Sequence, residues 1–104
     1  MTTSRMTALE EILAREPNDA TTHYMLANEY FKVQMFDRAV ATLRRYLVLK
    51  DDEGAAYRTL AQSLLRLGRF DEARQAYRDG LAAATRHGHQ PMIEEYSQAL
   101  KDLD

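Results

Sequence analysis

The residues whose types and spacing most readily suggest chemistry are two histidines near the end of the chain. His87 and His89 flank Gly88, and two nearby imidazoles can contribute ligands to a zinc or nickel site. Two ligands are too few for such a site, although the carboxylate of Glu94 could be a third. A polar turn between two helices would explain the same residues. A metal site, or a metal-dependent enzyme built on His87 and His89, is therefore an alternative, and the favoured interpretation has no metal.

Other groups that could support catalysis lack the spacing that catalysis requires. The serines lie outside any glycine-flanked nucleophile elbow, and the sequence has no phosphate-binding glycine loop or two-histidine metalloprotease motif. The adjacent carboxylates of Glu10 and Glu11 would point about 100° apart on a helix, whereas general acid–base catalysis needs groups that converge in a cleft. We expect a protein that is not an enzyme and has no cofactor.

Composition limits the partners and the compartment. The 104 residues include 14 basic and 16 acidic side chains, with a formal net charge of −2 and no cysteine. The negative charge argues against general affinity for nucleic acid or for an anionic membrane surface. No apolar run is long enough to cross a bilayer, and the charges at Arg5, Glu10, Glu11 and Arg15 interrupt any signal peptide. Together with the absence of cysteine, this predicts a cytoplasmic protein.

The chain has few helix breakers, and they separate segments with helical spacing of apolar residues. The predicted helices are a first one ending at Pro17, a second over about 20–33, a third from about Asp37 to Leu49, a fourth ending at Gly68, a fifth from about Asp71 to His87, and a sixth from about Pro91. We expect Asp37 at or beside a helix N-cap, and Gly68 and Gly88 as left-handed C-caps. Six helices without an alternating strand pattern predict an all-α fold.

Two of these segments repeat each other. The stretches "MFDRA" and "RFDEA" place Phe36 and Phe70, and Ala39 and Ala73, 34 residues apart, and such a period is typical of stacked structural repeats. The matching positions are His23, Leu26, Ala27, Tyr30, Ala39, Leu43 and Asp51 in one copy, and Tyr57, Leu60, Ala61, Leu64, Ala73, Tyr77 and Thr85 in the next. On these residues the chain resembles the tetratricopeptide repeat family, whose 34-residue helix–turn–helix unit has this pattern. His23 stands where the family often has tryptophan.

The resemblance implies a right-handed α-α superhelix in a single domain over residues 1–104. Its parts would be a half repeat at 1–19, full units at 20–53 and 54–87, and a C-terminal capping helix at 88–104. Four small residues would let the helix backbones approach one another: Ala27, Ala39, Ala61 and Ala73. In extent the chain is similar to small free-standing bacterial proteins of this family, which implies protein binding and not catalysis.

Family geometry also nominates a binding surface, a concave groove lined by the first helix of each unit. Its residues would be Tyr24, Asn28, Lys32, Arg58, Gln62 and Arg66. The three cations among them predict an adaptor that binds an acidic or carboxylate-bearing peptide or helix. The competing interpretation is an ordinary solvated helix face. A chaperone-type carboxylate clamp is not expected, because only Asn28 matches that motif.

Self-association is the main alternative to partner binding, since a short stack has two exposed ends. Met1, Met6 and Ile12 at one end, or Met92, Tyr96 and Leu103 at the other, could form such a surface. Amphipathic stripes more often complete the packing of the monomer, so we predict a monomer or a weak homodimer. The helical spacing of most aromatic residues predicts core positions and no nucleic-acid partner, whereas Tyr24 and Tyr96 are predicted to be exposed partner contacts.

Overall fold

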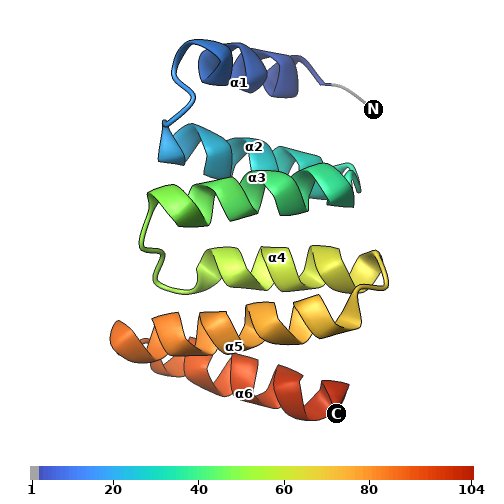
Figure 1. The fold of residues 1–104 in the computed structure, drawn as a ribbon, viewed down its shortest axis with the longest axis vertical. Helices are drawn as coiled ribbons and strands as arrows, with labels where there is room; N and C mark the ends of the chain where they lie inside the picture. Colours follow the sequence, from blue (N-terminus) through green and yellow to red (C-terminus); the bar gives the residue numbers. More distant parts are fainter. Residues whose placement is uncertain (1–2) are drawn as a thin grey trace. The chain divides into compact units, whose positions relative to one another are not determined.

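The computed structural model describes residues 3–104, which form six helices and no β-strand (Figure 1). The helices are α1 (Ser4–Arg15), α2 (Ala20–Lys32), α3 (Phe36–Leu49), α4 (Ala55–Arg66), α5 (Phe70–Arg86) and α6 (Gln90–Leu103). The predicted all-α fold of helix–turn–helix pairs is confirmed. No helix within these residues has both the length and the apolar character needed to cross a membrane.

The chain divides into two compact units. Unit 1 ends at Lys50 and contains α1–α3, and unit 2 is Asp51–Asp104 and contains α4–α6. The predicted repeat boundaries, 20–53 and 54–87, remain a prediction, and each range holds one helix pair, α2–α3 or α4–α5.

In unit 1, helix α2 packs against both α1 and α3. The core contains Met6 and Leu9 from α1, Leu26 and Tyr30 from α2, and Ala39 from α3. Met6 is only 1% exposed, and Ile12 packs against the same cluster. The apolar face of α1 is therefore used within the unit. Met1, which the self-association alternative also named, lies outside the described residues.

A polar contact on the edge of this core joins the three helices of unit 1. The Tyr30 hydroxyl donates a 2.6 Å hydrogen bond to the Glu10 carboxylate, and Nη1 of Arg38 lies 3.9 Å from the same oxygen. The Arg38 guanidinium also lies 5.9 Å from the centre of the Tyr30 ring. Because these side chains come from α1, α2 and α3, the contact fixes α1 against the helix pair.

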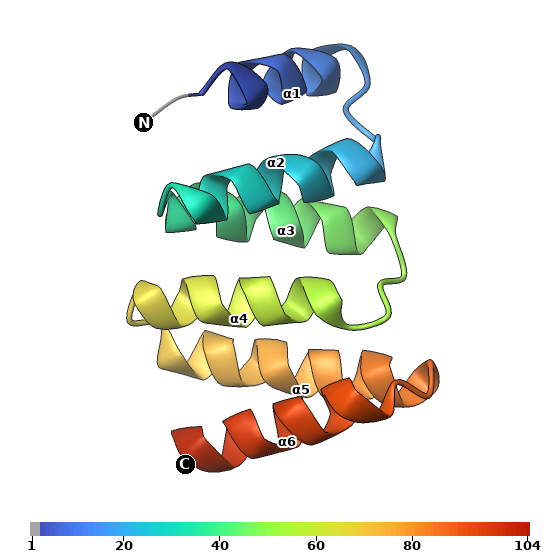
Figure 2. The ribbon, with the colours of Figure 1, turned by 180° about the vertical axis from the view of Figure 1, so that it is seen from behind.

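In unit 2, helix α5 packs against both α4 and α6, and Figure 2 shows α6 running alongside α5. Close approach of these helices depends on Gly80 in α5. A Cβ atom at this position would lie 2.8 Å from both Cβ of Tyr57 on α4 and Cε2 of Tyr96 on α6. Tyr96 is fully buried, and its hydroxyl donates a hydrogen bond to the backbone carbonyl of Gly54.

The predicted small residues between helices occupy the positions expected for them. Ala27, Ala39, Ala61 and Ala73 are all completely buried. A larger side chain at any of them would have to displace neighbouring atoms, because protein interiors are close-packed. Their predicted burial is therefore confirmed, and their role in the close approach of helix backbones stays a prediction.

The helix ends confirm two predicted caps and correct a third. Gly68 and Gly88 follow α4 and α5 with left-handed φ angles of +74° and +65°, as expected for C-caps. The expectation that Asp37 caps α3 is wrong, since the N-cap residue is Met35 and no side chain makes a cap hydrogen bond there. Asp37 lies inside the first turn, where its carboxylate still faces the positive end of the helix dipole.

Candidate partner-binding surfaces

The first candidate surface lies on α2, within unit 1. The α2 stripe consists of Tyr24, Asn28 and Lys32. Spacings of four residues place these side chains on one face of the helix. The Tyr24 ring is half-buried, and its centre lies 5.0 Å from that of Tyr46 on α3. Lys32 is 69% exposed, so the stripe runs from a packed aromatic residue to a solvated cation.

The single cation of the α2 stripe has an acidic neighbour. The Lys32 ammonium donates a 3.0 Å hydrogen bond to the carboxylate of Glu29, and Nε of Arg5 on α1 lies 3.3 Å from the same oxygen. The hydrogen bond from Lys32, followed by the charges of Lys32 and Arg5, lowers the pKa of the Glu29 carboxyl. This surface is consequently less basic than its predicted residues alone suggest.

The second candidate surface lies on α4, within unit 2, at sequence positions 34 residues after those of the first. The α4 stripe consists of Arg58, Gln62 and Arg66. Gln62 and Arg66 are exposed, and the Arg58 side chain is 36% exposed. Arg66 is two helical turns beyond Arg58, about 12 Å along the axis. The stripe presents two guanidinium groups separated by an amide.

A carboxylate from α6 binds the first of these guanidinium groups. Nε and Nη2 of Arg58 donate to Oε2 and Oε1 of Glu95, at 2.6 and 2.7 Å. This two-bond arrangement is the preferred geometry for an arginine–carboxylate pair. Hydrogen bonding from Arg58 lowers the pKa of the Glu95 carboxyl, and the guanidinium also lies 6.0 Å from the centre of the Tyr96 ring.

Sequence reasoning did not find Glu95 as a member of this surface. Arg58 and Glu95 are 37 residues apart, a separation that differs from the 34-residue period. The pattern of residues placed Glu95 near the N-terminus of a helix but gave no information on which helix faces it. Only the packing of α4, α5 and α6 brings the two side chains together.

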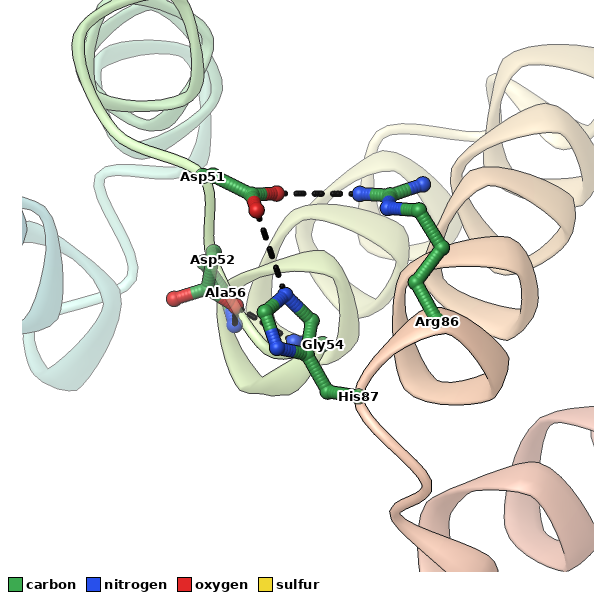
Figure 3. Close-up of polar contacts among 6 residues, drawn as sticks. All are labelled: Asp51, Asp52, Gly54, Ala56, Arg86 and His87. Carbon is green, nitrogen blue, oxygen red and sulfur yellow. Dashed lines mark hydrogen bonds and ion pairs between the residues drawn. The ribbon is translucent and has the colours of Figure 1, made fainter.

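The histidines that suggested a metal site lie in a different environment. Nε2 of His87 is 3.2 Å from Oδ2 of Asp51, and Nη2 of Arg86 donates to Oδ1 of the same carboxylate at 3.0 Å (Figure 3). The hydrogen bond from Arg86, with a smaller contribution from His87, lowers the pKa of Asp51. His89 is the N-cap residue of α6, and its Nδ1 is buried without a hydrogen-bond partner. Within residues 3–104 no three side chains of the metal-binding types form a donor set.

The same region of unit 2 shows how α4 begins. The Asp52 carboxylate accepts hydrogen bonds from the backbone N–H groups of Gly54 and Ala56, at 2.8 and 3.1 Å (Figure 3). These donors would otherwise be unpaired at a helix N-terminus. Asp51 and Asp52 therefore have structural roles. Asp51 contacts the end of α5, and Asp52 binds two backbone N–H groups at the start of α4, whose N-cap residue is Gly54.

The residues predicted for self-association at the C-terminal end are largely packed within unit 2. Tyr96 was also predicted to be an exposed partner contact, and that prediction is wrong because Tyr96 is completely buried. Its ring lies 5.7 Å, centre to centre, from the Tyr77 ring of α5. Met92 and Leu103 are half-buried. The outward face of α6 carries polar residues, among them Glu94, Gln98, Lys101 and Asp102.

The chain is similar to a protein family, to a bacterial protein and to several solved structures. A family model described as anaphase-promoting complex, cyclosome, subunit 3, matches residues 1–80. TPR repeat-containing protein PA0015 of Pseudomonas aeruginosa is 29% identical over 96 residues, which cover 92% of this chain and 91% of that protein. The solution structure of protein BPP2914 from Bordetella parapertussis is 30% identical, with a TM-score of 0.79, and the match covers 99% of this chain and 89% of that one. A structure of MamA AMB-1 shares the fold at 23% identity and a TM-score of 0.68, covering 95% of this chain and 66% of MamA.

Proposed function

Since this chain belongs to the tetratricopeptide-repeat-type family described as anaphase-promoting complex, cyclosome, subunit 3, we propose that it is a protein-interaction adaptor for acidic or carboxylate-bearing segments. The α2 stripe and the α4 stripe would each contact such a segment. Lys32, Arg58 and Arg66 would supply charge-assisted hydrogen bonds, and Asn28 and Gln62 would supply amide contacts. No catalytic step belongs to this proposal, and a cytoplasmic location in a bacterium is part of it.

The observation that carries the proposal is the contact between Arg58 and Glu95. The guanidinium is already oriented to bind both oxygens of one carboxylate, at 2.6 and 2.7 Å. A partner carboxylate with the same approach would need no reorganisation of the helix that carries Arg58. A preformed surface binds at a low entropic cost, because the scaffold is ordered before the partner arrives.

A second exposed cation further along α4, Arg66, also supports the proposal. Arg66 lies in the last turn of α4, where a cation also interacts favourably with the negative end of the helix dipole. An acidic segment that follows the α4 stripe would meet Arg58 first, then the Gln62 amide, and then Arg66. Two separated cations favour a partner with more than one acidic group.

Self-association has less support than partner binding. Met6 and Tyr96, which were central to that alternative, are 1% and 0% exposed. A dimer formed through other residues would be detected by the solution mass, which is measured beside every binding experiment below.

The test compares two double variants with equal changes of charge. Arg58→Gln with Arg66→Gln removes both cations of the α4 stripe. Arg78→Gln with Lys101→Gln, the control, removes two cations from exposed positions elsewhere in unit 2. Arg66 and Lys101 both lie in the last turn of their helices, so the control also matches the dipole effect.

A fluorescent hexaglutamate peptide serves as the acidic probe, and its anisotropy reports binding. We expect the stripe variant to bind about tenfold more weakly than the wild type, as for loss of one or two charge-assisted hydrogen bonds. We expect the control variant to retain most of the affinity. Equal binding by the two variants, both folded by circular dichroism, would reject the α4 stripe as the binding surface. Affinity capture from a lysate of the source organism with the same variants then identifies the natural partner.

A further inference from the structure

The α4 stripe has an unusual relation to α6, because one of its two cations is bound by a carboxylate of the same unit. Glu95 makes both of its hydrogen bonds to Arg58 with short distances, 2.6 and 2.7 Å. The pair is accessible to solvent, since the Arg58 and Glu95 side chains are 36% and 41% exposed. An incoming carboxylate can therefore reach the guanidinium, but it meets Glu95 there.

We infer that Glu95 is an intramolecular competitor that occupies the carboxylate site of Arg58 until an acidic partner segment displaces it. This inference rests on the proposed function. It adds a residue, Glu95, that determines the affinity for an acidic partner segment. Glu95 offers Arg58 the same chemical group, in the same two-bond geometry, that an acidic partner would offer. A segment with a single carboxylate would gain little by exchanging with Glu95, whereas a segment with several can also bind Arg66. The competitor thus selects for partners that are acidic at more than one position.

The exposure of the pair sets the size of the expected effect. Exposed arginine–carboxylate pairs are weak because water and salt screen them. Removing the competitor should therefore raise the affinity for an acidic segment about two- to fivefold, the range that corresponds to one exposed ion pair. A larger change would require repulsion between Glu95 and the partner in addition to competition.

The neighbouring residue provides a matched control. Glu94 lies beside Glu95 on α6, is exposed, and accepts a long hydrogen bond of 3.4 Å from the Gln90 amide. Glu94→Gln and Glu95→Gln change the net charge of unit 2 equally and at nearly the same place. Any difference between these two variants reports the direct contact with Arg58 and not the long-range field.

A second variant separates the contact from the charge. Glu95→Asp keeps the carboxylate but shortens the side chain by one methylene, which is enough to disturb a two-bond pair whose distances are already short. If competition requires the direct contact, Glu95→Asp should also bind more tightly than the wild type, although less so than Glu95→Gln. Glu94 and Glu95 are both exposed, so circular dichroism and thermal melting should show that all of these variants are folded.

The experiment measures hexaglutamate binding by anisotropy for the wild type, Glu94→Gln, Glu95→Gln, Glu95→Asp and the double variant Arg58→Gln with Glu95→Gln. We expect a two- to fivefold tighter complex for Glu95→Gln, a smaller change for Glu94→Gln, and no gain in the double variant, because the guanidinium is then absent. Equal affinities of Glu95→Gln and Glu94→Gln, with measurable binding by the wild type, would overturn the competitor and leave the proposed function standing. If neither the wild type nor Glu95→Gln binds the peptide, both the competitor and the acidic-partner proposal are wrong.

Discussion

Gln34 and Gly68, 34 residues apart, end their helices with the same backbone turn. Their φ angles are +64° and +74°. The N–H of Gln34 donates to the carbonyl of Phe31, as the N–H of Gly68 does to that of Leu65. In both turns the next N–H reaches back five residues, from Met35 to Tyr30 and from Arg69 to Leu64, each at 2.9 Å. Both are Schellman motifs, but only one has the residue type that the left-handed conformation favours.

Replacing Gln34 with glycine should stabilise the protein. A residue with a Cβ atom costs about 1–2 kcal/mol in the left-handed conformation, and glycine removes this strain. Glycine also has more conformational freedom in the unfolded chain, which offsets about 0.5–1 kcal/mol of the gain. We expect Gln34→Gly to raise the free energy of unfolding by about 0.5–1 kcal/mol in urea denaturation. Gly68→Gln is the reciprocal control and should lower it by a similar amount. A Cβ at Gly68 would meet nothing within 4 Å, so this control reports the backbone conformation alone. Stability changes of the same sign in both variants would contradict this account.

Gly80→Ala should destabilise the protein although it is a substitution toward a better helix former. Alanine normally stabilises a helix interior by about 1 kcal/mol relative to glycine. At this position, however, the new methyl group would lie 2.8 Å from Cβ of Tyr57 and from the Tyr96 ring. Overpacking of this kind costs about 1–3 kcal/mol. Ala82→Gly, at an exposed position of the same helix, measures the difference in helix propensity between alanine and glycine without any overpacking. Equal stability of Gly80→Ala and the wild type would argue against the close contact of α4, α5 and α6.

Ala61→Leu tests the small helix contact of α4. Ala61 is completely buried, and the added atoms have no free space, so we expect a loss of about 1–3 kcal/mol in the free energy of unfolding. Ala8→Leu, at an exposed position of α1, is the control and should change the stability by less than about 0.5 kcal/mol. Chemical denaturation of both variants measures the difference. Similar stabilities would show that the register of α4 is not the one described.

Tyr96→Phe should destabilise unit 2 at neutral pH. The substitution keeps the buried ring but removes the hydroxyl that donates to the Gly54 carbonyl. The Gly54 carbonyl keeps a second donor, the backbone N–H of Tyr57 at 3.2 Å, so we expect the loss of one net hydrogen bond, about 0.5–1.5 kcal/mol. Thermal melting and urea denaturation at pH 7 measure the loss, and hydrogen exchange of the first residues of α4 locates it. Unchanged stability would mean that the Tyr96 hydroxyl contributes no net free energy through this hydrogen bond.

The same tyrosine makes the protein sensitive to alkaline pH. Burial raises the pKa of Tyr96 from 10.0 to about 12. Because the unfolded chain loses the phenol proton first, the contribution of Tyr96 to stability is complete below pH 10 and is lost as pH rises toward about 12. We expect the wild type to lose stability more steeply with pH in this window than Tyr96→Phe. Parallel curves of unfolding free energy against pH for the two proteins would contradict the raised pKa.

The parts of the fold that repeat could be predicted from the sequence, because a repeat shows the same residue type twice. Ala27 and Ala61 are examples. The cap at Gly68 was predictable from its residue type alone, because glycine favours a left-handed C-cap. The cap at Gln34 could not be predicted in this way, since its backbone conformation comes from the turn and not from its side chain. Asp37 was misplaced because an acidic residue near a helix start can either cap the helix or face its dipole, and the sequence does not distinguish the two.

The candidate site was predictable only along each helix. Spacings of four residues place Arg58, Gln62 and Arg66 on one face without any knowledge of the tertiary structure. The contact with Glu95 and the burial of Tyr96 depend on how α6 packs, and the residue types of α6 do not repeat those of α2 or α4, which would have revealed its register. Sequence reasoning therefore identified the cations but not the carboxylate that already holds one of them.

The hydrogen bond from Tyr96 to Gly54 also has a consequence for the order of events during synthesis. The hydrogen bond from the N–H of Gly54 to the Asp52 carboxylate spans two residues and can form as soon as this segment leaves the ribosome. The carbonyl of the same glycine accepts locally from the Tyr57 N–H, but its bond from the Tyr96 hydroxyl needs a residue 42 positions later, which at about 5–20 residues per second is a delay of roughly 2–8 s. Helix formation takes about a microsecond, so the local hydrogen bonds of Gly54 have millions of such intervals in which to form and break before the Tyr96 hydroxyl is available.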